Sequence, residues 1–552
     1  MTIDQVTSTK DHRTLTDSIS TIKSSALRLL SGTMLSRISG MLRDMVLAFC
    51  FGTHEALAAL LVAFRLSHIC RRLFGEGALQ SAFIPAFEEI RKDESSRAFQ
   101  FFRDLTCTMT LFLIGFIVLS MLGLVSSQYM IDFSPGNKQI VQYMIILMPS
   151  LLFICLFGLN SSLLQCQKRY FTVGVAPAFF NISISLGSLF FIGSEPRSAM
   201  PYVAVFIVLG CAFQWLMTFF PTFKTIKREL STQFTKEIQL FSPDIRRFGA
   251  PLALGMLGIG ASQINNTVDA LFARWADPEG PAQLWYALRL VQLPLTLFGI
   301  ALSGALLPPL SRSIQAGRRE EYLRFIDFAL RRVFAFLVPC TIALFIFGVS
   351  IINLIFGRGD FQLHSILTTS ICLHGYAIGL LPMGLIIVLA PAFYAYKDMK
   401  TPARGAFISL ILNLVLNCFF VFVFDLKALS ITLATSISSW VNVVYLYKRL
   451  KGHLGELVTP DSKKELIKMC LVTVSAGIAT WFFANYLYIP PALFHFFADE
   501  QSALSQNLVD QVVYFTVPAL FYGVMLLLFS WIMKANDLLV LCRLKKDAPI
   551  IE

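Results

Sequence analysis

The chain is 552 residues long, 56% hydrophobic and only 14% charged, with a formal net charge of +12. Soluble proteins carry about 25% charged residues, so this composition excludes a soluble globular protein. Apolar runs of about 18 residues or more recur along the chain, and each is long enough to cross a bilayer as a helix. We therefore predict an all-α polytopic membrane protein.

About fourteen transmembrane helices are predicted from these apolar runs. In chain order they lie at residues 24–50, 55–83, 104–127, 139–165, 172–194, 199–222, 245–273, 281–311, 328–356, 363–396, 403–424, 427–447, 465–488 and 511–533. Residues 1–22 are polar and lack an apolar core, so no cleaved signal peptide is expected. The loops on one side hold most of the Lys and Arg residues, among them Arg91, Lys92, Lys227, Arg228, Lys397, Lys400, Lys463 and Lys464. The positive-inside rule then places both termini in the cytoplasm, and the net charge needs no nucleic-acid partner to explain it.

An internal repeat links the two halves of the chain. Residues 63–85 (AFRLSHICRRLFGEGALQSAFIP) align with residues 287–309 (ALRLVQLPLTLFGIALSGALLPP), and Arg65 falls on Arg289. At nearly the same shift, Asp44 falls on Asp269. Because six is an even number of helices, both copies would insert the same way up, as in transporters built from parallel repeats. We predict two six-helix lobes related by a parallel internal repeat, followed by two C-terminal helices.

The predicted organisation follows from this repeat. An N-lobe spans residues 24–223, a C-lobe spans residues 245–450, and a cytoplasmic linker at 224–244 joins them. The two C-terminal helices lie within 451–533. Residues 1–23 and 534–552 are expected to be cytoplasmic tails.

Nearly all charged residues inside the predicted spans belong to the first two helices of each repeat. A charge at the bilayer centre costs about 2.5–3.5 kcal/mol, so these side chains are expected to face a water-filled or ligand-filled cavity. Arginine outnumbers acid there, and guanidinium groups bind phosphate in a planar, bidentate way. We therefore predict a substrate with a multivalent oxyanion, bound by Arg37, Arg43, Arg65, Arg71, Arg72 and Arg289.

Some of these residues also have structural interpretations. Arg72 and Glu76 are spaced i, i+4 and fit a structural ion pair as well as a substrate contact. Asp44, beside Arg43, could likewise lock helices together or act in gating. Arg37, Arg65 and Arg289 have no obvious acid nearby in the sequence, which favours substrate binding. A helical wheel does not place Arg43 and Arg71 on the same face as the others.

A candidate sodium site is predicted in the C-lobe. Asp269 follows Asn265 by one turn, Asn413 and Asn417 share one face of an apolar helix at i, i+4, and Thr435 adds a hydroxyl. One carboxylate with amide and hydroxyl oxygens suits a hard monovalent cation. The alternative is that these polar side chains only hold helices together. The eleven Cys form no CxxC pair and the seven His show no ligand spacing, so no other metal or cofactor is expected.

The motifs at residues 35–52 (LSRISGMLRDMVLAFCFG) and 64–87 (FRLSHICRRLFGEGALQSAFIPAF) resemble the signature of the MurJ/MviN family of lipid II flippases. The segments SQINNTVDALFA (262–273) and VLAPAFYAYKDMKTP (388–402) resemble later motifs of that family in order. The resemblance implies the fold of the multidrug/oligosaccharidyl-lipid/polysaccharide exporter superfamily. It also implies a role in peptidoglycan biosynthesis, with the family's cavity arginines falling on Arg37, Arg43, Arg71 and Arg289.

The resemblance further implies partners and location. The substrate would be lipid II, an undecaprenyl-pyrophosphate disaccharide pentapeptide, with its lipid tail in a groove beside the last two helices. The chain would act as a monomer in the bacterial inner membrane, among membrane lipids and other cell-wall synthesis proteins. The sequence leaves membrane potential, sodium and protons open as energy sources, since no GxxxxGK[ST] motif for ATP is present.

The sequence also departs from the family pattern. Position 58 is Ala where the family usually has an acid, and positions 288 and 292 are Leu and Gln. Anion binding is unaffected, but a mechanism that needs an acid at position 58 is placed in doubt. The alternatives are a flippase for another polyprenyl-pyrophosphate oligosaccharide and a cation-coupled drug antiporter of the same superfamily. A lipid-linked enzyme is disfavoured because the predicted outside loops are mostly short.

Overall fold

The structure is a computed structural model that describes residues 19–74, 78–230, 237–488 and 507–541. Within these ranges all regular elements are helices. The first lobe contains α1 (Ile19–Phe51), α2 (Glu55–Phe74), α3 (Ala78–Asp93), α4 (Ser95–Met130), α5 (Pro135–Leu147), α6 (Ser150–Cys166), α7 (Tyr170–Phe190) and α8 (Pro196–Leu230). The second contains α9 (Pro243–Ala276), α10 (Gly280–Gln315), α11 (Arg319–Phe356), α12 (Leu363–Ala395), α13 (Lys400–Phe422) and α14 (Leu429–Leu454).

Every predicted span is covered by a helix or a pair of helices. The span predicted at 55–83 corresponds to α2 and α3, and residues 75–77 between them are outside the described residues. The span at 139–165 is a pair, α5 and α6, bent by 46°. Pro149 precedes α6 and has no backbone N–H for a continuous helix, which accounts for this break.

Hydropathy separates the helices into two groups. Among the described residues, nine helices are long and apolar enough to cross a membrane, and the bent pair α5–α6 would make a tenth. α1, α2, α9 and α10 are outside this set. These four carry the charged residues that the sequence analysis places inside the membrane, except Glu76, which is not among the described residues.

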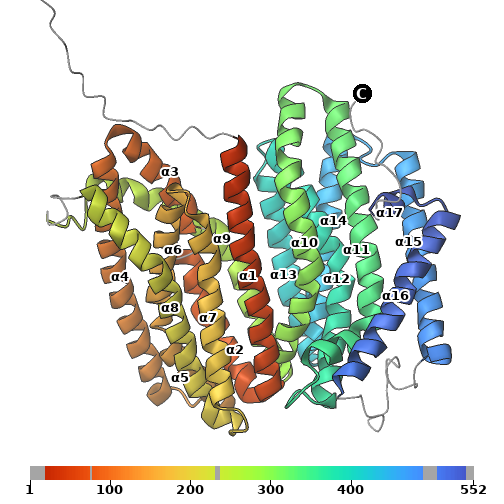
Figure 1. Ribbon diagram of the computed structural model, residues 1–552, viewed down its shortest axis with the longest axis horizontal. Coiled ribbons are helices and arrows are strands. Elements are labelled where there is room, and N and C mark those ends of the chain that lie inside the picture. Colours follow the sequence, from red (N-terminus) through yellow and green to blue (C-terminus); the bar gives the residue numbers. More distant parts are fainter. Residues whose placement is uncertain (1–18, 75–77, 231–236, 489–506, 542–552) are drawn as a thin grey trace, which may run out of the picture.

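The two lobes lie side by side, with α1–α8 on the left of Figure 1 and α10–α14 on the right. Each lobe contains six predicted spans, and the same spans pack together in both lobes. The first span packs with the fifth (α1 with α7, α9 with α13), and the fifth packs with the sixth (α7 with α8, α13 with α14). The fourth also packs with the sixth in each (α6 with α8, α12 with α14). This agrees with the predicted repeat. α9 additionally packs against α2 and α3, so it bridges the lobes.

The C-terminal helices α15 (Pro460–Phe482) and α16 (Leu508–Ile532) pack against α11, and the short π-helix η2 (Phe483–Tyr488) continues α15. The predicted cytoplasmic tail at 534–552 begins with a further helix, α17 (Asn536–Leu541). Asp537 in α17 is buried and forms an ion pair with Arg331 of α11 at 3.1 Å. The start of the tail is therefore docked on the C-lobe.

Candidate functional site

One buried carboxylate joins the two lobes. Asp44 of α1 has no exposed surface, and its Oδ1 accepts hydrogen bonds from Arg43 Nη2 at 2.7 Å and Trp285 Nε1 at 3.2 Å. Its Oδ2 pairs with Arg289 Nε at 2.7 Å. Arg43 and Asp44 belong to the N-lobe, whereas Trp285 and Arg289 belong to α10 of the C-lobe. The carboxylate is therefore an interlobe link as well as the counter-ion of two arginines.

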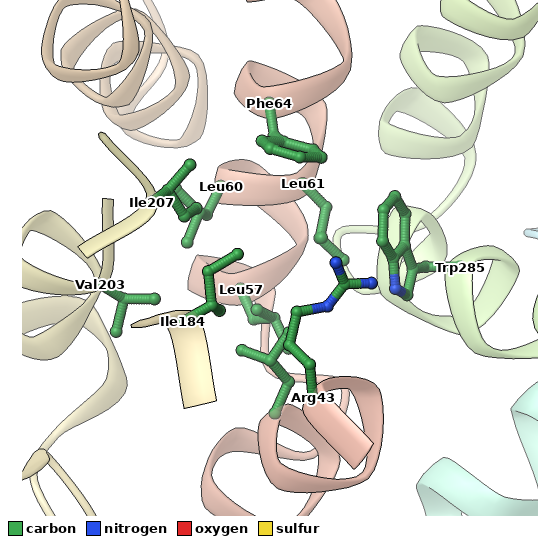
Figure 2. A pocket seen from close by; sticks show the side chains of 10 residues that line it. Arg43, Leu57, Leu60, Leu61, Phe64, Ile184, Val203, Ile207 and Trp285 are labelled. Atoms are coloured by element: carbon green, nitrogen blue, oxygen red, sulfur yellow. The ribbon is translucent and has the colours of Figure 1, made fainter. Parts of the chain in front are cut away.

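The indole of Trp285 is the centre of an arginine cluster. The guanidinium carbons of Arg43, Arg65 and Arg289 lie 5.8, 5.7 and 4.8 Å from its ring centroid, within the range of cation–π attraction. Figure 2 shows the Arg43 guanidinium beside the indole. We call Arg43, Asp44, Arg65, Trp285 and Arg289 the central cluster. With three guanidinium groups and one carboxylate, it carries a net positive charge.

Further contacts fix two of these arginines from other helices. Arg43 Nη1 donates to Asn181 Oδ1 of α7 at 2.9 Å, and Asn181 in turn donates to the backbone of Ser36. Arg65 Nη1 donates to the Asn266 carbonyl of α9 at 3.4 Å. Arg43 is thus held inside the N-lobe, while Arg65 reaches across to the C-lobe.

Three of the predicted arginines, Arg43, Arg65 and Arg289, come together in the central cluster. Arg37 is exposed on α1, about 10 Å along the helix from Asp44 at 1.5 Å per residue. The side chains of Arg71 and Arg72, and all of Glu76, lie outside the described residues. Their predicted roles therefore remain predictions.

Arg289 has no acid nearby in the sequence, but in the structure it pairs with Asp44 of the other lobe. Ala58, at the position where the family usually has an acid, is fully buried in the protein core. Trp285 and Asn181 were not foreseen. An indole at i, i+4 before Arg289 was the only sequence signal for Trp285.

An apolar pocket lies behind the central cluster. Arg43 and Trp285 form its polar side, and the remaining walls are aliphatic and aromatic side chains of the N-lobe (Figure 2). These are Leu47, Leu57, Leu60, Leu61, Phe64, Ile184, Val203 and Ile207. Arg43 and Asp44 are buried beside these walls, so the electrostatic interaction between them is stronger than it would be in water.

The predicted sodium-site residues are also neighbours. Asp269 Oδ1 accepts from Asn417 Nδ2 at 3.0 Å, and Asp269 Oδ2 accepts from Thr435 Oγ1 at 3.4 Å. Asn413 joins this network when its amide is oriented to satisfy its hydrogen bonds, because its Nδ2 then donates to Asp269 Oδ1 at 3.0 Å. Asn417 Oδ1 is buried and has no hydrogen-bond donor among the described residues. A cation could use this orphaned oxygen together with the Asp269 carboxylate, so the side chains present fit a sodium ion.

The two lobes are also joined at the end where α1 meets α2, which we call the closed end (residues 49–55, 274–286 and 359–365). Thr53 Oγ1 contacts Glu279 Oε2 at 2.5 Å and Ser365 Oγ at 2.8 Å. Tyr286 donates to the Gly52 carbonyl at 3.3 Å, and the Asp360 N–H donates to the Phe49 carbonyl at 3.0 Å. These bonds link the end of α1 and the α1–α2 loop in the N-lobe to helix ends and loops of the C-lobe.

Two glycines make the closed end possible. Gly52 and Gly359 have φ of +54° and +62°, a region that favours glycine. A Cβ at Gly52 would lie 2.4 Å from the Asp360 carbonyl oxygen, and one at Gly359 would lie 2.2 Å from that of Phe49. A side chain at either position would therefore push the lobes apart.

We expect Gly359→Ala to open the closed end. Spin labels attached at Ser198→Cys and His364→Cys, in a background without native cysteines, would report the interlobe distance by pulsed electron paramagnetic resonance. The variant should shift the distribution to longer distances. Gly193→Ala is the matched control, because Gly193 also has a positive φ, +73°, but has nothing within 4 Å of its Cβ position. If the Gly359→Ala variant and the protein with Gly359 gave the same distribution of interlobe distances, the predicted clash with the Phe49 carbonyl would be refuted.

Comparison with known proteins agrees with this architecture. The family model described as lipid II flippase MurJ matches residues 47–498. A "Probable lipid II flippase MurJ" of Chlamydia trachomatis is 32% identical over 461 residues, covering 83% of this chain and 84% of the relative. One of Chlamydia muridarum is 31% identical over 525 residues, covering 93% and 95%. A solved structure, "Lipid II flippase MurJ, inward closed conformation", matches with a TM-score of 0.71 at 22% identity, over 92% of this chain and 99% of that one. The chain therefore belongs to the MurJ family of lipid II flippases.

Proposed function

We propose that this protein moves lipid II from the cytoplasmic to the outer leaflet of the bacterial inner membrane. Its membership of the family and the names of its relatives support this substrate. The observation that carries the proposal is the central cluster, a positively charged site between two lobes of a membrane protein. A cationic drug would be repelled there, which disfavours an antiporter of positively charged compounds.

At the central cluster, the pyrophosphate of the substrate would take the place of the Asp44 carboxylate as the partner of Arg289. Arg289 keeps 34% of its side-chain surface exposed, whereas Arg43 keeps 7%. An arriving pyrophosphate would therefore meet Arg289 and Arg65 first, and would replace Asp44 as the partner of Arg289. Arg43 would stay paired with Asp44, so the carboxylate would not be left without a counter-ion. Substrate binding would thus release the ion pair that joins the lobes at this point.

Transport would proceed by alternating access. In this state the closed end would face the periplasm, because the loops rich in Lys and Arg gather at the other end of the helices. Both termini would then be cytoplasmic. Release of Asp44 from Arg289 would let the lobes rock and the closed end open, while the polyprenyl tail stays in lipid beside α15 and α16. A membrane potential that is negative inside favours outward movement of the anion by about 2.3 kcal/mol per charge per 100 mV.

Sodium binding at Asp269 would be a second energy source. In the N-lobe, the repeat-mate Asp44 has the adjacent Arg43 as a fixed cation, whereas Val268 precedes Asp269. Among the described residues none forms an ion pair with Asp269; Arg65, whose charge acts on this carboxylate from a distance, contacts Trp285 and the Asn266 carbonyl instead. The C-lobe carboxylate would therefore need a mobile cation where the N-lobe one has an arginine.

We expect sodium to raise the thermal stability of the purified protein and potassium not to. Asp269→Asn should abolish the sodium effect, because it removes the charge that attracts the cation while keeping the shape of the side chain. Asp277→Asn, on the nearby α9–α10 loop, is the control and should retain the effect. A flat response, or an equal rise with potassium, would leave these residues as helix–helix contacts.

Direct binding tests the proposed substrate. We expect the purified protein to bind lipid II much more tightly than the same lipid without its pyrophosphate, because the arginines recognise the anion. Equal binding of the two lipids would count against the role of the central cluster. If the protein bound another polyprenyl-pyrophosphate oligosaccharide tightly but not lipid II, the central cluster would still bind the anion, but the substrate would be that other lipid.

A further inference from the structure

A second basic site lies away from the central cluster, in a groove between the start of α13 and the end of α14. The groove has a volume of about 520 Å³ and is lined by Ala403, Arg404, Phe407, Ile408, Tyr445 and Arg449. Gly405 allows the helices to approach here, because a Cβ at that position would lie 2.6 Å from Asn442 Oδ1. The small side chain of Ala403 leaves the space beside this contact empty. We call this the α13–α14 groove.

The α13–α14 groove has two cations and no anion. Arg404 and Arg449 are both exposed, and neither forms a hydrogen bond or ion pair with another described residue. The Arg449 guanidinium carbon lies 5.5 Å from the Tyr445 ring centroid, so the ring orients it at the groove. The nearby carboxylate of Asp398 accepts from the backbone N–H groups of Lys400 and Thr401 and is engaged at the start of α13. Two guanidinium groups are therefore available to an outside anion.

An apolar strip leads away from Arg404 along the same face of α13. Phe407, Ile411 and Val415 follow Arg404 at i+3, i+7 and i+11, and their side chains are 63%, 45% and 56% exposed. Exposed apolar residues are ordinary on a membrane helix. This strip differs from an ordinary lipid-facing surface because a groove with two arginines lies at one end of it. A ligand with an anionic head and an apolar chain would contact both parts at once.

We propose that the α13–α14 groove binds an anionic phospholipid, with its phosphate between Arg404 and Arg449 and one acyl chain along Phe407, Ile411 and Val415. Guanidinium groups bind phosphate oxygens through charge-assisted hydrogen bonds. Basic pockets between transmembrane helices recognise anionic head groups in the same way. A soluble phosphate compound would leave the apolar floor of the groove exposed, so a lipid is the better fit.

Native mass spectrometry of the full-length protein tests this site with phosphatidylglycerol and phosphatidylcholine as probes. Arg404→Gln with Arg449→Gln should weaken phosphatidylglycerol binding by at least about tenfold, since contacts of charged groups contribute about 1.5–3 kcal/mol. Binding of phosphatidylcholine should change little. Arg246→Gln with Arg247→Gln removes two exposed charges from the start of α9 and is the matched control, which should bind as the original protein does. Thermal unfolding without added lipid checks that each variant is folded.

Two further measurements distinguish the sources of the phosphate. Phe407→Ser keeps both arginines and should weaken phosphatidylglycerol binding, because it interrupts the path of the acyl chain. Glycerol phosphate, the soluble head group alone, should not compete at concentrations where the lipid saturates. Equal loss in the Arg246/Arg247 variant, equal affinity for the two lipids, or full competition by glycerol phosphate would each overturn the proposal.

Discussion

Replacing Arg289 with Ala is expected to abolish lipid II flipping while leaving the protein folded. Arg289 is the most accessible arginine of the Asp44 ion-pair network, with 34% of its side chain exposed. It would contact the pyrophosphate directly and release Asp44 when it does so. Loss of a charged, bidentate contact of about 1.5–3 kcal/mol lowers binding by roughly 10–100-fold, and loss of the coupling to lobe opening should lower transport further. Flipping in proteoliposomes loaded with lipid II measures this.

The lysine variant separates geometry from charge. Arg289→Lys keeps the positive charge but loses the planar fork, so we expect only part of the flipping rate to return. Arg37→Ala should also abolish transport, since Arg37 lies on α1 toward the cytoplasmic entrance. Arg246→Ala is the control and should flip lipid II at the original rate. Full activity of both Arg37→Ala and Arg289→Ala would show that substrate binding does not depend on these arginines.

The helices could be predicted from the sequence because each apolar run reflects local chemistry. Where a run was interrupted, the prediction was less accurate. Pro149 lies at the bend between α5 and α6, but hydropathy alone counted these two helices as one span. The helix α17 was missed because it is only six residues long and packs through Asp537 and Leu538. Its stability comes from docking onto α11, not from its own sequence pattern.

The central cluster shows what a linear sequence does not encode. The charges of Arg43, Asp44, Arg65 and Arg289 identified it as a site, since so many charges inside a membrane need a common partner. The pairing of Asp44 with Arg289 depends on how two lobes meet, and no local spacing reports that. The sodium-site residues were easier to group, because Asn413 and Asn417 share one face of α13 and the repeat aligned Asp269 with Asp44. The sequence could not show that Asn417 Oδ1 lacks a donor, which is a property of the packed helices.

Removal of the Asp44 carboxylate should produce the largest loss of stability among the variants considered. Asp44 has no exposed surface, and Arg43 beside it is also buried. Asp44→Ala would leave Arg43 as a buried charge with the Asn181 amide and the Trp285 ring as its remaining contacts, and Arg43 and Arg289 would both lose their counter-ion. Removing one partner of a buried ion pair costs about 3–5 kcal/mol. Chemical denaturation in detergent should therefore show a loss of this size in the free energy of unfolding.

A double variant identifies the cause of that loss. If the unpaired charge of Arg43 is responsible, Arg43→Met with Asp44→Ala should recover a large part of the stability, because the buried cation is gone as well. If Asp44 acts instead through its link to the C-lobe, the double variant should be no more stable than Asp44→Ala. In that case Arg289→Ala, which breaks the same link and leaves Arg43 paired, should destabilise the protein as much as Asp44→Ala does. We expect recovery in the double variant and only a small effect of Arg289→Ala, because Asp44 retains two hydrogen bonds from Arg43 and one from Trp285 when Arg289 is absent.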